Sequence, residues 1–149
     1  MTQVPIVSVI MPVYNGGTYL HTAIQSILHQ KFSDFEFIII NDGSSDNSLE
    51  IIESFEDKRI KCISFEQNQG IVAALNKGVE SSKGKYIARM DADDISHPER
   101  LGKQVDFLEK RTEIGIVGTG AFIFSINKNN KIKGHSYPLA LLENIPIKL

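Results

Sequence analysis

The feature that most constrains the fold of this 149-residue chain is a regular alternation of short apolar segments with segments of helical periodicity. The apolar segments have the length of strands and lie at residues 7–13, 35–40, 60–65, 85–90 and 114–118. Alternation of this kind predicts an α/β domain with a mostly parallel sheet. Apolar residues at helical spacing form four stripes between the strands: Leu20, Ile24, Ile27 and Leu28; Leu49, Ile52 and Phe55; Ile71, Leu75 and Val79; and Leu101, Val105 and Leu108.

The pattern changes after Gly120. Two apolar segments, 122–124 and 132–137, flank the polar residues 127–130, and this arrangement predicts a β-hairpin. No internal repeat or interdomain linker interrupts the sequence, so we expect residues 1–149 to form a single domain.

Charge and cysteine content exclude several classes of function. The 16 basic and 18 acidic residues are mixed along the sequence, which argues against nucleic acid as a partner. The single cysteine, Cys62, lies in an apolar-rich segment, where we expect a buried and inert thiol. The sequence has neither a run of 18 apolar residues nor a secretion signal. We therefore expect a cytoplasmic location, which includes a peripheral position at the inner face of the membrane.

Four polar clusters fall at the carboxyl ends of four successive predicted strands. They are residues 14–17, 41–46 and 68–70 and the acidic run 91–94. In an open parallel sheet the ligand crevice lies outside the carboxyl ends of the strands, so we expect these clusters to converge on one pocket. Each cluster alone is also ordinary turn and cap chemistry, but their coincidence favours a site.

The acidic run Asp91-Ala92-Asp93-Asp94 directly follows an apolar segment. In an extended segment Asp91 and Asp93 project to the same side and can share one ion or one polar ligand. Oxygen ligands suit Mg²⁺ or Mn²⁺, and ligand type alone does not separate the two. The alternative is a solvated acidic turn before a helix that is capped near Ser96 and opened by Pro98.

Together the clusters describe a site for a nucleoside diphosphate. Backbone amides of a glycine-containing loop at a helix start can hold phosphate oxygens. Asp42 can accept hydrogen bonds from a nucleobase or ribose, or it can cap the helix that follows. Tyr14 offers a ring for base stacking or for packing. A cation on Asp91 and Asp93 would stabilise a departing diphosphate.

These residues resemble glycosyltransferase family 2, whose members have the GT-A fold and transfer sugars from nucleotide-sugar donors. Four motifs carry the resemblance in order and spacing: residues 9–15, 41–44, 68–70 with Asn76, and 91–94. The resemblance spans residues 6–120 and implies a GT-A, Rossmann-like α/β/α sandwich of three layers. It also implies that Asp42 reads the base and that Asp91 contacts the ribose or sugar side of the donor. Asp93, with Asp91, would hold Mg²⁺ or Mn²⁺ on the diphosphate. The implied donor-binding residues are Pro12, Tyr14, Asn15, Asp42, Asn68, Gly70, Asn76 and Asp91.

The implied reaction is metal-assisted inverting transfer of a sugar from a nucleotide-sugar donor. The resemblance favours a UDP-sugar as donor and a saccharide or lipid-linked hydroxyl as acceptor, as in the synthesis of cell-envelope polysaccharides. The family's general base lies well beyond the metal motif, and no residue after Phe124 resembles it; Glu143 is expected on a helix surface. We therefore expect the N-terminal, donor-binding part of the domain, with the acceptor-binding half largely missing. An exposed apolar face would then promote self-association.

Two positions depart from the family pattern, and two other functions stay open. Asn41 stands where the second motif usually opens with an acid, and Leu75 stands where some relatives carry an arginine. A sugar nucleotidyltransferase also uses carboxylates and Mg²⁺ at strand ends, but loop 14–18 has no Lys or Arg for a triphosphate. A catalytically incomplete nucleotide-binding module would keep the same donor site without turnover.

Overall fold

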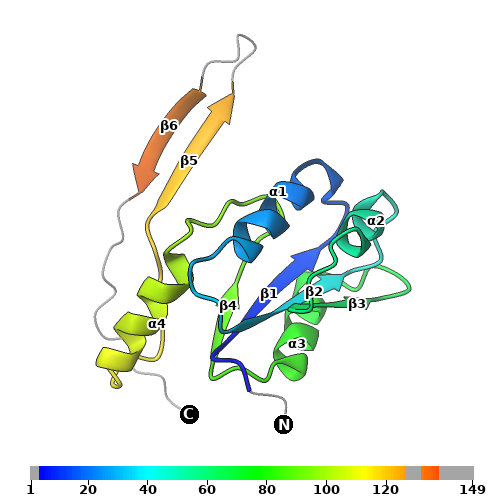
Figure 1. Ribbon diagram of the computed structural model, residues 1–149. Coiled ribbons are helices and arrows are strands. Elements are labelled where there is room, and N and C mark those ends of the chain that lie inside the picture. The colour runs from blue at the N-terminus through cyan, green and yellow to red at the C-terminus, as the bar shows by residue number, and fades with distance from the viewer. Residues whose placement is uncertain (1–3, 127–131, 138–149) are drawn as a thin grey trace. The chain divides into compact units, whose positions relative to one another are not determined.

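The computed structural model describes residues 4–126 and 132–137, and the chain divides into two compact units, residues 1–102 and 103–149 (Figure 1). The first unit contains β1 (Val7–Val13), α1 (Gly17–Leu28), β2 (Phe35–Asn41), α2 (Ser48–Glu53), β3 (Ile60–Ser64), α3 (Ile71–Ser81) and β4 (Tyr86–Arg89). Helix α4 (Arg100–Lys110) begins in this unit and continues into the second, which also contains β5 (Ala121–Ile126) and β6 (Ile132–Tyr137).

The strands of the first unit form a parallel sheet in the order β3-β2-β1-β4. In its register, Val7 lies opposite both Phe35 and Tyr86, and Phe37 lies opposite Ile60. Because β2 and β4 flank β1 on opposite sides, the order of the chain across the sheet reverses at β1. A reversal of this kind opens a crevice at the carboxyl ends of the neighbouring strands. The prediction of an α/β domain with a parallel sheet is confirmed.

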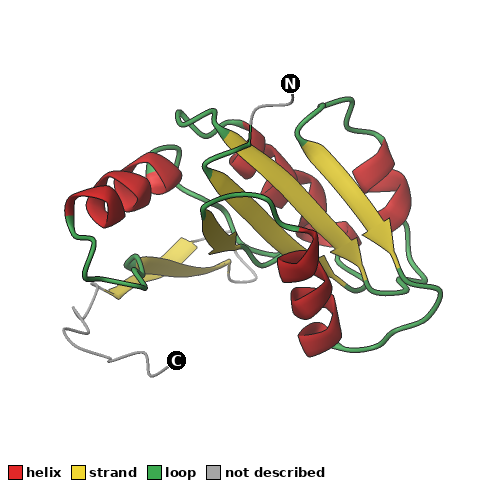
Figure 2. Cartoon of the chain, turned by 90° about the horizontal axis from the view of Figure 1, so that it is seen from below, coloured by secondary structure: helices red, strands yellow, loops and turns green. Residues whose placement is uncertain are grey.

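Helices lie on both faces of this sheet, as the three-layer prediction requires (Figure 2). The central strands β1 and β2 are buried along almost their whole length, because strands that are covered on both faces need nearly continuous apolar runs. Ile38 and Ile40 pack with Ala74 of α3 on one face. The edge strands β3 and β4 are only partly buried.

A buried hydroxyl positions β4 beside β1. The Ser8 hydroxyl donates to Glu36 Oε1 (2.6 Å) and accepts from the backbone amide of Gly84 (2.9 Å). A Cβ at Gly84 would lie 2.5 Å from the Ser8 backbone nitrogen, so this close approach requires glycine. The contact fixes the start of β4, whose far end leads into the acidic run.

Helix α3 packs through a different face from the predicted stripe. Ile71 and Val79 are about half exposed, whereas Ala74 and Gly78 are buried. A Cβ at Gly78 would collide with the Ile10 side chain, so the small residues let the helix approach the sheet closely. The predicted stripe is therefore wrong by one helical position, because close backbone approach outweighs the burial of larger apolar side chains.

Three other sequence predictions need correction. Residues 114–118 form no strand, since no described strand pairs with them, and Ile116 is exposed. Cys62 is exposed rather than buried because it lies on the edge strand β3. Helix α4 begins at Arg100, not at Pro98, and Ser96 is buried beside Gln30 instead of capping the helix.

The second unit contains the predicted hairpin. Strands β5 and β6 pair antiparallel, with Ala121 opposite Tyr137, and the predicted turn at 127–130 lies outside the described residues. Glu143 lies outside them as well. Among the helices that the structure describes, none has the length and apolar content needed to cross a bilayer.

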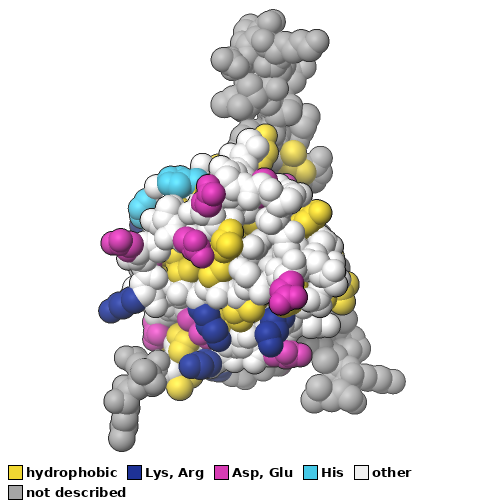
Figure 3. Space-filling view, turned by 90° about the vertical axis from the view of Figure 1, so that its right-hand side faces the viewer, with side chains coloured by type: hydrophobic (Ala, Val, Ile, Leu, Met, Phe, Trp, Pro, Cys, Tyr) yellow, Lys and Arg dark blue, Asp and Glu magenta, His cyan; other side chains and the backbone are white. Residues whose placement is uncertain are grey.

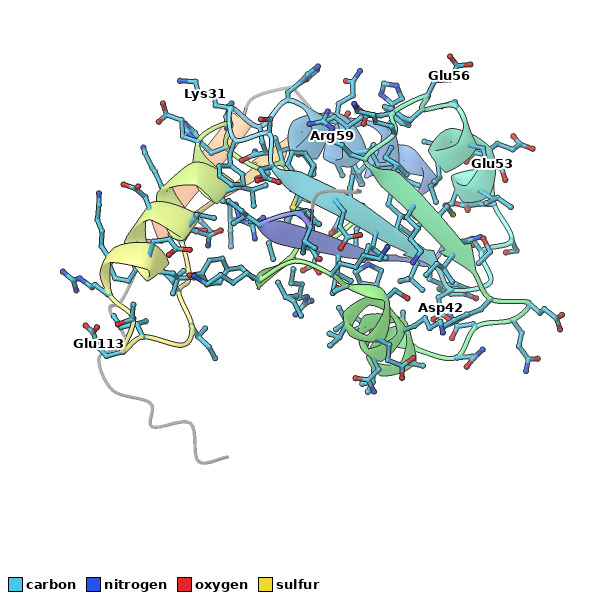
Figure 4. All side chains as sticks on the ribbon, turned by 60° about the horizontal axis from the view of Figure 1, so that its bottom comes forward. Lys31, Asp42, Glu53, Glu56, Arg59 and Glu113 are labelled. Atoms are coloured by element: carbon cyan, nitrogen blue, oxygen red, sulfur yellow. The ribbon has the colours of Figure 1, made fainter. Side chains whose placement is uncertain are left out.

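An ion pair closes the loop before β3, at the opposite end of the strands from Asp42 (Figure 4). Arg59 pairs with Asp57 at 2.7 Å, donates to the Leu28 carbonyl oxygen (3.1 Å) and lies over the Phe35 ring. Hydrogen bonds from Arg59 lower the pKa of the Asp57 carboxyl from 3.8 to about 2. The pair therefore connects this loop to the end of α1.

We expect Asp57→Asn to lower the free energy of unfolding by about 1 kcal/mol near neutral pH, since solvent screens a pair that is a quarter exposed. Folding lowers this pKa, so the stabilisation is present above pH 3.8 and is lost as the pH falls toward 2. Urea unfolding of both proteins across this range measures the difference. Glu56→Gln, at an exposed neighbouring carboxylate, is the control. A penalty that does not change with pH would contradict the assignment.

Candidate functional site

The polar loops enclose a cavity of about 560 Å³ at the carboxyl ends of the strands. All four loops that follow β1, β2, β3 and β4 contribute to its lining. Two of the predicted donor residues lie outside the lining, Gly70 at the start of α3 and Asn76 within this helix. The predicted residues within the lining are Pro12, Tyr14, Asn15, Asp42, Asn68, Asp91 and Asp93.

Asn15 joins the first loop to the second. It has a positive φ of 50°, and its side-chain oxygen accepts from the backbone amides of Ser45 (2.8 Å) and Asp46 (3.3 Å). Its own amide donates to the Ser44 hydroxyl at 3.0 Å. Asn tolerates this left-handed conformation better than most residues. Asn15 thus lines the cavity, while its carboxamide oxygen holds the second loop through these hydrogen bonds.

We expect Asn15→Ala to destabilise the fold by about 2–3 kcal/mol. It removes the hydrogen bonds that the side-chain oxygen accepts, and it replaces a residue that tolerates positive φ with one that does not. Asn15→Gly removes the same hydrogen bonds, but glycine adopts a positive φ without steric strain. It should be about 1 kcal/mol more stable than the alanine variant. Chemical denaturation of the wild type and the two variants measures the cost of the lost hydrogen bonds and the cost of the backbone conformation. Equal stability of the two variants would show that the φ of 50° carries no cost.

The backbone amides of the glycine-containing loop after β1 already have partners inside the protein. Gly16 donates to the Ser48 hydroxyl and Gly17 donates to Asp46 Oδ2, each at 3.0 Å. Hydrogen bonds from Ser48 and Gly17 lower the pKa of the Asp46 carboxyl. These amides are therefore engaged within the protein, because the second loop uses them to fix the start of α1.

Asp42 joins the second loop to the third. Its side chain is 3% exposed, and its two carboxylate oxygens accept from the backbone amides of Gln69 (2.7 Å) and Gly70 (2.9 Å). Figure 4 shows Asp42 beside α3. A carboxylate at this position satisfies the amide of the N-cap residue Gly70 and lies near the positive end of the helix dipole. Asp42 therefore holds the loop that enters α3 and does not cap the helix that follows it in the sequence. Two carboxylate lone pairs remain for a ligand.

Asn41, which departs from the family pattern, has a structural role. It is 3% exposed, and its side-chain oxygen accepts from the Ser44 amide (3.2 Å) while its side-chain nitrogen donates to the Ser64 hydroxyl (3.4 Å). The carboxamide supplies both an acceptor and a donor. An acid at this position would lose the donor.

The acidic run is a turn and not an extended segment. Strand β4 ends at Arg89, and the Asp94 amide donates to the Asp91 carbonyl oxygen at 3.3 Å. Asp91 and Asp93 nevertheless both line the cavity. The Asp91 carboxylate is not free, because the Arg89 guanidinium donates to both of its oxygens, with a shortest distance of 2.8 Å.

Two polar side chains, the partly buried Arg100 and the buried Gln30, anchor this turn at its ends. Arg100 donates to the Arg89 carbonyl oxygen at 2.7 Å. Gln30, 6% exposed, donates to the Ser96 hydroxyl (3.1 Å) and the His97 carbonyl oxygen (2.8 Å), and its side-chain oxygen accepts from Leu101 (3.1 Å). These bonds hold the backbone before and after the acidic turn.

The donor set of the turn fits a divalent cation in kind but not in number. Burial, and then the negative charges of Asp91 and Asp93, raise the pKa of the Asp94 carboxyl, as expected for carboxylates crowded together. Yet within the described residues no group of three or more His, Cys, Asp and Glu side chains can hold a metal ion. Mg²⁺ usually completes its coordination with waters and substrate phosphates. A cation held by Asp91 and Asp93 would need such ligands.

The lining also contains Tyr19, Ile71 and Arg89, which the sequence patterns did not assign to the site. Arg89 is the one cationic side chain among the described lining residues, against the carboxylates of Asp42, Asp91 and Asp93. The sequence signal that could have found Arg89 is its position two residues before Asp91, because residues two apart at a strand end point to the same side. Elsewhere, acidic and basic side chains are interspersed on the face in Figure 3.

Comparison with known proteins gives a consistent set of matches. The family model described as glycosyl transferase family 2 matches residues 8–146. An uncharacterized glycosyltransferase of Haemophilus influenzae is 42% identical over 139 residues, which cover 92% of this chain and 43% of that protein. TuaG of Bacillus subtilis, whose name proposes a role in teichuronic acid biosynthesis, is 37% identical over 110 residues, 72% of this chain and 44% of that protein.

The solved structures agree with the fold. The crystal structure of S. aureus TarS 1-349 in complex with UDP-GlcNAc superposes with a TM-score of 0.68 at 28% identity. The match covers 71% of this chain and 32% of that one. This chain therefore spans less than half the length of these relatives. The GT-A fold expected from the sequence motifs is confirmed for the part that matches.

Proposed function

The chain belongs to glycosyl transferase family 2, and we propose that it forms the donor-binding part of an enzyme that transfers a sugar from a nucleotide-sugar donor to an acceptor hydroxyl. The observation that carries the proposal is the convergence of all four strand-end loops on one cavity that contains Asp42, Asp91 and Asp93. A UDP-sugar is the first candidate donor, because TarS, 28% identical to this chain, was solved with UDP-GlcNAc.

The charge of the cavity supports a metal cofactor. Three carboxylates face one guanidinium in the described lining, so the cavity would repel a diphosphate that arrives without a cation. Asp93, with Asp91, would hold Mg²⁺ or Mn²⁺ through carboxylate oxygens, and diphosphate oxygens would supply further ligands. When bound, the cation would neutralise charge on the departing diphosphate.

The nucleoside would lie on the side of the cavity formed by the first three loops. Asp42 keeps two lone pairs for donors on the base or ribose, while its bonds to Gln69 and Gly70 fix its orientation. Tyr14 and Tyr19 line the same cavity and are 54% and 62% exposed, so a base can contact their rings. Asn68 extends this wall from the third loop.

The proposed reaction is inverting transfer. The acceptor oxygen bonds to the anomeric carbon as the bond from that carbon to the diphosphate oxygen breaks, and the acceptor proton passes to a base. We assign that proton transfer to no described residue. The residues of this chain would bind the donor, orient its diphosphate and hold its nucleoside. A saccharide or lipid-linked acceptor of the cell envelope is proposed from the similarity to TuaG.

Calorimetric titration of the purified chain with UDP, GDP and dTDP, with and without Mn²⁺, tests the proposed function. We expect UDP to bind more tightly with Mn²⁺, and Asp93→Ala to lose at least about tenfold in affinity. The control is Asp106→Ala, which removes an exposed carboxylate that is paired with Lys110 on α4. UDP affinity that responds neither to Mn²⁺ nor to Asp93→Ala would contradict the proposed metal site.

A further inference from the structure

The cavity contains a cation that is already engaged by one of the proposed metal ligands. Arg89 Nη2 lies 2.8 Å and 3.1 Å from the two oxygens of Asp91, and Arg89 Nε lies 3.1 Å from the first of them. This two-pronged contact satisfies a carboxylate well, because the guanidinium presents parallel donors. In this state both oxygens of Asp91 accept hydrogen bonds from the guanidinium, which therefore competes with a cation for this carboxylate.

The pair is built so that it can separate. The side chains of Arg89 and Asp91 are 56% and 41% exposed, and ion pairs in contact with water are weak. The backbone of Arg89, in contrast, is held by its pairing with Ile10 in the sheet and by the bond from Arg100 to its carbonyl oxygen. The guanidinium can therefore move on its flexible side chain without disturbing the strand or the acidic turn.

Phosphate has few other donors nearby. The amides of residues 15–17, at the start of α1, donate to side chains of the second loop. Among the described lining residues Arg89 supplies the one positive charge. A diphosphate in this cavity would therefore meet Arg89 as its nearest cationic side chain once that side chain leaves Asp91.

We propose that Arg89 exchanges partners when the donor binds: it neutralises Asp91 in the empty cavity, gives up this carboxylate to the divalent cation, and then contacts the diphosphate. This inference rests on the proposed function and adds a positioning residue to it. The chain would consequently bind the free cation weakly, and would bind the cation and the nucleoside diphosphate together.

Arg89→Gln tests the exchange in two binding measurements on the full chain. For Mn²⁺ alone, followed by electron paramagnetic resonance, the variant should bind about two- to fivefold more tightly than the wild type, because the competing cation is gone. For UDP at saturating Mn²⁺, the variant should bind about tenfold more weakly, while uridine affinity should not change. Lys61→Gln removes the same charge from β3, at the opposite edge of the sheet, and should alter neither value.

The outcomes separate the exchange from the proposed function. If Arg89→Gln binds Mn²⁺ no more tightly than the wild type, including the case in which neither binds it, the exchange is overturned. Equal losses for UDP and uridine would overturn it as well, because the role of Arg89 would not be at the phosphate. The proposed function fails separately, if the wild type binds none of the nucleoside diphosphates with or without Mn²⁺. The Mn²⁺ titrations still decide the competition at Asp91 in that case.

Discussion

Replacing Asp42 with alanine is expected to lower the free energy of unfolding by about 2–4 kcal/mol and to abolish binding of UDP. The carboxylate is buried and accepts hydrogen bonds from two backbone amides of the third loop, at 2.7 Å and 2.9 Å. Each hydrogen bond to a charged group contributes about 1.5–3 kcal/mol, and the partly exposed amides recover some of that from water. The variant therefore loses the hydrogen bonds that hold the loop before α3 and one wall of the cavity in a single change.

Asp42→Asn separates the two roles of this side chain. The asparagine side chain keeps the shape and one acceptor oxygen, but its NH₂ group would face one of the two backbone N–H donors. About half of the stability loss of Asp42→Ala should therefore remain. Urea unfolding and UDP calorimetry on both variants measure the two effects. If UDP binding is lost in Asp42→Asn while about half of the lost stability returns, the carboxylate contacts the nucleoside directly. Asp42→Ala with unchanged stability would contradict its role in holding the loop before α3.

The strands were predictable because their burial follows from the sequence itself. Residues 7–13 and 35–41 are almost uninterrupted apolar runs, and a strand covered by helices on both faces needs such a run. The polar clusters were predictable because parallel topology sends every strand end to the same edge. These two arguments place most of the predicted site residues around one cavity.

The pairings between loops were not predictable, because they join residues that are distant in the sequence. Nothing in the first loop indicates that Asn15 accepts from residue 45, or that Ser48 occupies the amide of Gly16. The face of α3 was missed for a different reason. A stripe of larger apolar residues is the usual signal of burial, whereas this helix packs on Ala74 and Gly78. Close approach of two backbones is a tertiary property that hydrophobic periodicity does not record.

Gly43→Ala is expected to be the most destabilising of three glycine substitutions, at about 2–5 kcal/mol. Gly43 has a φ of +65°, where a Cβ costs about 1–2 kcal/mol. That Cβ would also lie 2.6 Å from the Asn68 nitrogen and 2.7 Å from Gln67 Cα, which are backbone atoms of the third loop. Because this backbone cannot turn aside as a flexible side chain can, overpacking adds a further 1–3 kcal/mol, roughly. Loops two and three should separate, and UDP binding should be lost with them.

Two matched substitutions divide the effect of Gly43→Ala into its parts. Gly70 has a φ of 89° and a ψ of 159°, a backbone region essentially restricted to glycine, but open space where a Cβ would be. Gly70→Ala should therefore cost only the conformational term, about 1–3 kcal/mol. Gly102 lies in α4, and its Cβ would meet Phe32 at an ordinary 3.7 Å, so Gly102→Ala should be neutral or stabilising by up to about 1 kcal/mol. Urea unfolding of the three variants gives the order. Equal losses in the free energy of unfolding for Gly43→Ala and Gly70→Ala would show that the third loop moves to make room for the added Cβ. The close contact between loops two and three would then not hold the site together.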